Sequence, residues 1–70
     1  MKEREKLRTL VSYWIEHARE HSGEFKEWGE RLKGMGEEEI SQEILSAAKE
    51  MEQVGISLSK ALKRLEQKEI

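Results

Sequence analysis

Apolar residues recur at alternating spacings of four and three along two segments of this 70-residue chain, and this repeat constrains the fold more than any other feature. Such spacing places the residues of each segment on one side of an α-helix and is typical of helices that pack as in a coiled coil. We call the two rows together the apolar stripe, and its single polar member is His21. The stripe runs through Leu7, Val11, Trp14, Ala18, His21, Phe25, Trp28 and Leu32, and then through Ile40, Ile44, Ala47, Met51, Val54, Leu58, Ala61 and Leu65.

The two rows are separated by Gly34-Met35-Gly36, whose glycines can end a helix and reverse the chain. We therefore expect one domain over residues 1–70, with a helix over about 2–33, a turn at 34–36 and a second helix over about 37–68. So short a link requires an antiparallel arrangement. The predicted fold is an all-α, coiled-coil-like two-helix hairpin with the apolar stripe inside it, in which Leu32 faces Ile40 and Leu7 faces Leu65.

A flank of small residues runs beside the stripe on both predicted helices. A hairpin of this length buries little apolar surface, and chains below about 70–80 residues commonly need a further source of stability. We therefore predict that the chain forms a homodimer, a four-helix bundle, through this flank. The other interpretation is that the flank is ordinary surface. The predicted dimer surface comprises Ile15, Ser22, Gly29, Ser41, Ala48 and Gly55.

One group of residues has the chemistry of a metal site. His17, His21 and Glu24 are spaced so that they share one side of the first helix, and Glu50 is expected to approach from the second helix. Two imidazoles and two carboxylates can hold Zn²⁺, Fe²⁺ or Ni²⁺. All 15 acidic residues are Glu, however, so carboxylates near any histidine are expected by chance. The favoured interpretation is therefore no cofactor, with His21 bonded to Glu24 or Glu20 and His17 solvated.

The segment from His17 to His21 also matches the H-x-x-E-H order of inverted zinc peptidases, with Glu20 in the position of the base. A peptidase further requires a third metal ligand, a substrate cleft and an oxyanion stabiliser, for which a two-helix chain has little room. The chain contains no cysteine and no glycine-rich phosphate loop. We therefore predict that the protein is not an enzyme but a small structural or interaction module, with metal binding as the alternative.

Charge and hydropathy limit the remaining partners. The net charge of −2 gives no overall attraction to nucleic acid, and no apolar run is long enough to span a membrane, so we expect a cytoplasmic location. Basic residues gather where the two chain ends are expected to meet. This basic end could contact an acidic partner, so a protein partner besides the chain itself stays open. It comprises Lys2, Arg4, Lys6, Arg8, Lys60, Lys63, Arg64 and Lys68.

The stretch Trp14-Ile15-Glu16-His17-Ala18-Arg19-Glu20-His21, followed by Phe25 and Trp28, resembles a group of short prokaryotic proteins of unassigned function. The proteins of this group look like helical hairpins, and they carry a W-I-E-H-x-x-E-H segment in the first helix. The resemblance covers most of the chain and implies a helical hairpin in a prokaryotic cytoplasm. It implies no activity.

Overall fold

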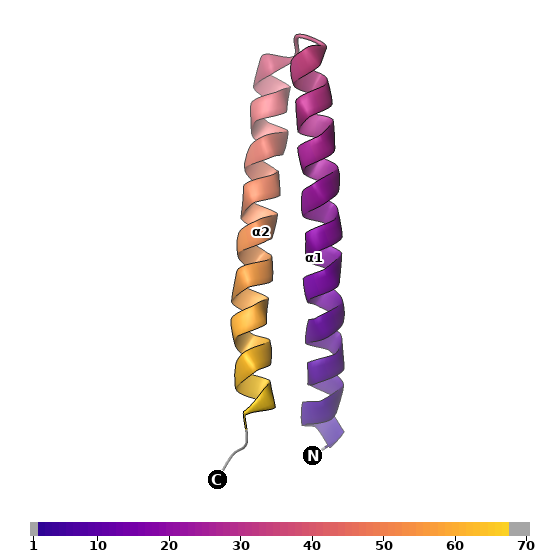
Figure 1. Cartoon of the computed structure of the whole chain (residues 1–70), viewed down its shortest axis with the longest axis vertical. Helices are drawn as coiled ribbons and strands as arrows, with labels where there is room; N and C mark the ends of the chain where they lie inside the picture. Colours follow the sequence, from indigo (N-terminus) through magenta and orange to yellow (C-terminus); the bar gives the residue numbers. More distant parts are fainter. Residues whose placement is uncertain (1, 68–70) are drawn as a thin grey trace.

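The chain forms two long helices that lie side by side and run in opposite directions (Figure 1). The computed structural model describes residues 2–67, in which α1 spans Lys2–Gly34 and α2 spans Glu38–Glu66. The molecule measures 56 × 15 × 11 Å between Cα atoms. The predicted helical hairpin is confirmed. Gln67 is extended, and the predicted helix end at residue 68 lies outside the described residues.

The chain reversal is built from local backbone hydrogen bonds. The Glu37 N–H donates to the Leu32 carbonyl at 2.9 Å, and the Gly36 N–H donates to the Lys33 carbonyl at 3.1 Å. The bond from Glu37 spans Gly36 and requires a positive φ there, and Gly36 has a φ of 85°. The glycine at the predicted turn therefore ends α1 and directs the chain into α2.

The two helices pack mainly through small residues, of which only Ala18 belongs to the apolar stripe. The most buried positions between them are Val11, Ala18, Ser22 and Gly29 in α1, with Ser41 and Ala48 in α2. The Ser22 hydroxyl donates to the Ala48 carbonyl at 3.1 Å, and the Ser41 hydroxyl donates to the Gly29 carbonyl at 2.7 Å. Side-chain hydroxyls reach a facing backbone only when two helices lie close together, so small side chains are required here.

The prediction that the apolar stripe forms the core is wrong for five of its large members, which are exposed: Leu7, Trp14, Trp28, Ile40 and Val54. Trp14 is 42% exposed, Trp28 is 53% exposed and Val54 is 44% exposed. Val11 and Ala18 of the stripe are buried as predicted, and its other members are half-buried. At the exposed tryptophan Trp28, the buried position is the next residue, Gly29. Each helix is thus rotated about its own axis relative to the prediction. The pairing of residues along the length of the hairpin is nearly the predicted one.

Gly29 shows why the rotation brings small residues inside. A Cβ placed on Gly29 would collide with the side chain of Leu45 on the facing helix. A Cβ placed on Gly23, in the same helix, would meet nothing within 4 Å. The close approach of α1 and α2 therefore depends on the missing side chain at Gly29.

No helix among residues 2–67 is both long and apolar enough to cross a membrane. The cytoplasmic location expected from the sequence stays a prediction.

The contrast between two glycines tests the helix packing. We expect Gly29→Ala to lower the free energy of unfolding by about 1–3 kcal/mol, because the added methyl group displaces Leu45. Gly23→Ala is the matched control, and it should raise that free energy by up to about 1 kcal/mol, since alanine favours the helix and finds open space. Urea denaturation at one protein concentration measures both. Equal stability of the two variants would contradict the packing described here.

Candidate functional site

Large apolar side chains gather on one side of the hairpin because small residues occupy the helix–helix interface. Trp28 precedes the interface residue Gly29 in α1, and Ile40 precedes the interface residue Ser41 in α2. Since the helices are antiparallel, residues that precede interface residues lie on the same side of both. We call this side the aromatic face. It comprises Leu7, Leu10, Trp14, His17, His21 and Trp28 of α1, with Ile40, Ala47 and Val54 of α2.

Aromatic rings form a continuous row along α1. Tyr13, His17, His21 and Phe25 follow one another at intervals of four residues. The ring centroids lie 5.1 Å apart for Tyr13 and His17, 4.7 Å apart for the two histidines, and 5.9 Å apart for His21 and Phe25. The outer two pairs are stacked and the two histidine rings meet edge to face. These contacts orient both imidazoles within the aromatic face.

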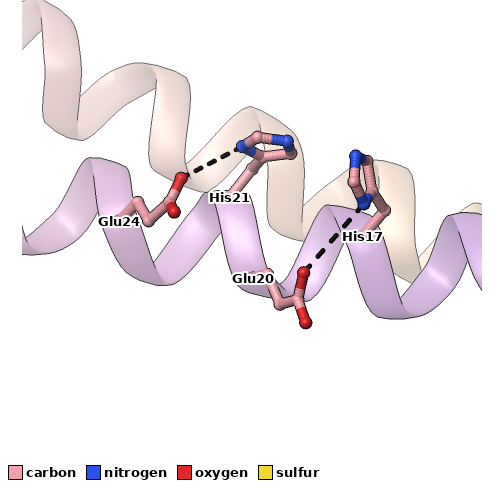
Figure 2. A network of polar contacts seen from close by, with 4 residues as sticks. All are labelled: His17, Glu20, His21 and Glu24. Carbon is pink, nitrogen blue, oxygen red and sulfur yellow. Dashed lines mark hydrogen bonds and ion pairs between the residues drawn. The ribbon is translucent and has the colours of Figure 1, made fainter.

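Each histidine also faces a glutamate one turn further along α1, as Figure 2 shows. The Nδ1 atom of His21 lies 3.2 Å from Oε1 of Glu24, and the Nδ1 atom of His17 lies 4.0 Å from Oε1 of Glu20. The histidine side chains are 41% and 50% exposed, respectively. Neither Nε2 atom has a hydrogen-bond partner within residues 2–67.

The four-ligand metal cluster expected from the sequence does not form in the single chain. Within residues 2–67, no three or more His and Glu residues are grouped closely enough to hold a metal ion. His17, His21 and Glu24 share one side of α1 as predicted, but Glu50 on α2 does not complete a cluster with them. The contact between His21 and Glu24 expected in the favoured interpretation is present, although the His21 side chain is 41% exposed and does not lie in a core.

The predicted dimer surface is mostly inside the hairpin. Ser22, Gly29, Ser41 and Ala48 are buried between α1 and α2, so a second copy cannot dock on them, and this part of the prediction is wrong. The other two members, Ile15 and Gly55, are half-buried and line a groove. Sequence reasoning missed the aromatic face because the apolar repeat was interpreted as the core of a single hairpin.

The basic end forms where the two helices finish together. The Arg4 guanidinium donates to the Arg64 carbonyl at 3.4 Å, which ties the start of α1 to the end of α2. Lys68, the last predicted member of the basic end, lies outside the described residues.

Comparison with known proteins identifies a family but no characterised relative. The sequence pattern of the family described as "Domain of unknown function (DUF8180)" matches residues 7–65. No curated protein and no solved structure matches.

A charge placed at Ala48 tests where the small residues lie. Ala48 is 4% exposed, so Ala48→Glu buries an unpaired carboxylate between the helices. We expect a loss of at least about 3 kcal/mol and therefore unfolding of the hairpin, visible by far-UV circular dichroism. Ser46→Glu is the matched control, because Ser46 is exposed on the same helix, and it should leave the spectrum unchanged. A fully helical Ala48→Glu variant would place Ala48 at the surface instead.

Proposed function

This chain belongs to the family described as "Domain of unknown function (DUF8180)", and we propose that it is a non-enzymatic structural module that forms a homodimer through its aromatic face. The observation that supports the proposal is the exposure of large apolar side chains on one side of the hairpin. Contiguous apolar surface of this kind marks an association site in a soluble protein. The most exposed members are Leu7, Leu10, Trp14, Trp28, Ile40 and Val54, each between 41% and 53% exposed.

A single hairpin buries little surface, which limits the stability of an isolated chain. Its accessible area is 6035 Å², whereas a folded monomer of this mass exposes about 4,500 Å². Its fully buried apolar residues within the described chain are Val11, Ala18 and Ala48, which together form a very small core. A standard protein interface buries about 800 Å² on each partner, which is roughly half of this excess. Association therefore supplies part of the burial that the fold itself lacks.

The shape of the molecule suits a face-to-face pair. The broad side measures 56 by 15 Å between Cα atoms, which matches the area of about 800 Å² that each partner covers in a standard interface. The Arg31 guanidinium lies 4.7 Å from the ring centroid of Trp28 and holds this large side chain at the surface. Tryptophan is among the residues that contribute most to interfaces. Two such faces, related by a two-fold axis, form a four-helix bundle.

Two exposed aliphatic residues on α2 provide a matched test. Val54 belongs to the aromatic face and is 44% exposed, whereas Ile56 is 48% exposed and lies off that face. In sedimentation equilibrium we expect the unmodified chain to have twice the 8.2 kDa monomer mass. Val54→Glu should weaken dimerisation by at least about tenfold, because the carboxylate is desolvated at the interface. Ile56→Glu should leave the mass unchanged.

A monomeric mass for the unmodified chain at about 100 µM would contradict the proposed dimer, since it implies an affinity too weak to stabilise the fold. Equal effects of Val54→Glu and Ile56→Glu would contradict the choice of face.

A second candidate function, metal binding, rests on the two histidine–glutamate contacts. Histidines that bind a metal through Nε2 commonly donate the Nδ1–H to a carboxylate. Both His17 and His21 have Nδ1 turned towards a glutamate, so their Nε2 atoms are the ones available to a metal (Figure 2). Each chain supplies two such ligands, and four-coordinate Zn²⁺ needs further ligands from a second copy or from water.

Calorimetric titration with ZnCl₂ tests this candidate. We expect saturable binding by the unmodified chain and its loss in the double variant His17→Ala/His21→Ala, because both imidazoles are removed. Glu50→Gln is the control, since Glu50 does not join the histidine cluster, and it should bind as the unmodified chain does. Binding that survives in the double variant would exclude the two histidines as ligands.

A further inference from the structure

A groove runs between α1 and α2 on the side away from the aromatic face. Arg19 and Lys26, which line it, stand five residues after Trp14 and His21, and this spacing places them about 140° further round the helix. The groove has a volume of about 690 Å³, which lies within the 300–1,000 Å³ typical of small-molecule sites. It therefore offers a binding site separate from the aromatic face.

The floor of the groove is apolar and is opened by two glycines. Ile15, Met51 and Ile56 line it together with Gly23 and Gly55. Glycine is a poor helix former, yet both glycines stand in helix interiors. A Cβ at either would meet nothing within 4 Å, so packing of the hairpin does not require them, in contrast to Gly29. Their missing side chains leave space along the floor.

The rim of the groove is basic although the chain as a whole is acidic. Arg19, Lys26, Lys60 and Lys63 line the groove, and Glu52 is the one carboxylate among the lining residues. None of these four cations makes an ion pair within residues 2–67. Cations around an apolar floor attract a ligand that combines a negative group with an apolar body.

We propose that this groove binds a free long-chain carboxylate, with the acyl chain along the apolar floor and the carboxylate among the lysines of the rim. The α2 lining extends from Met51 to Lys63, a rise of about 18 Å, which is the scale of an extended acyl chain. Lys60 and Lys63 stand at one end of this lining, where they can pair with the carboxylate. The site goes beyond the proposed dimer and uses none of the exposed residues of the aromatic face.

Titration calorimetry with sodium myristate below its micelle concentration tests the proposal on the full chain. We expect saturable binding of one myristate per hairpin and at least about tenfold weaker binding of the neutral analogue 1-tetradecanol. Gly23→Leu/Gly55→Leu should weaken myristate binding by at least about tenfold, because the leucines fill the floor, while circular dichroism shows an unchanged helix content. Gly34→Leu is the control outside the groove.

Charge variants test the rim without filling the floor. Lys60→Gln/Lys63→Gln should weaken myristate binding by at least about tenfold, whereas Lys33→Gln/Lys49→Gln, which removes two exposed lysines outside the groove, should not. Absence of myristate binding by the unmodified chain would overturn the proposal, as would full affinity of the glycine double variant. Loss of myristate binding in Val54→Glu with the helix content unchanged by circular dichroism would also overturn it, because the ligand would then occupy the aromatic face. Unchanged binding in that variant supports the groove even if the chain proves monomeric.

Discussion

The close approach of α1 and α2 is the constraint on which the rest of the structure depends. Two serine hydroxyls donate across the interface to carbonyls of the facing helix, Ser22 to Ala48 and Ser41 to Gly29. At the level of Gly29 even an added Cβ would collide with the Leu45 side chain. The consequence is a hairpin held together by small residues, which excludes its own tryptophans from the interior. The large apolar side chains are thereby displayed on one broad side.

Much of the fold could be predicted from the sequence because its signals are local. The four-three repeat predicted two helices, and the glycines at 34 and 36 predicted the reversal that Gly36 makes with its positive φ. The rotation of the helices could not be predicted in this way. The row containing Trp28 and the row containing Gly29 have the same period and differ by one residue. Hydrophobicity favours burial of the row that contains Trp28. The structure instead buries the row that contains Gly29, where serine hydroxyls donate to carbonyls of the facing helix. The periodicity of the sequence does not reveal such hydrogen bonds.

For the candidate sites too, contacts within one helix could be predicted from the sequence, whereas contacts between the two helices could not. The contact of His21 with Glu24 was predictable because both lie on one helix, three residues apart. The expected approach of Glu50 depended on the rotation of α2 and was wrong for the single chain. The sequence contains two rows of helical period beside each other, and the prediction assigned the large residues to the core and the small residues to a dimer surface. The structure instead buries most of the small residues between the two helices of one chain.

The central claim is that small residues join the helices of one chain while the aromatic face joins two chains. Isotope-filtered NOE spectroscopy on a dimer mixed from labelled and unlabelled protein separates contacts within a chain from contacts between chains. The account predicts interchain cross-peaks from the ring protons of Trp14 and Trp28, and intrachain cross-peaks between Gly29 and Ser41. Interchain cross-peaks between Gly29 and Ser41, with intrachain contacts from both tryptophans to α2, would contradict it.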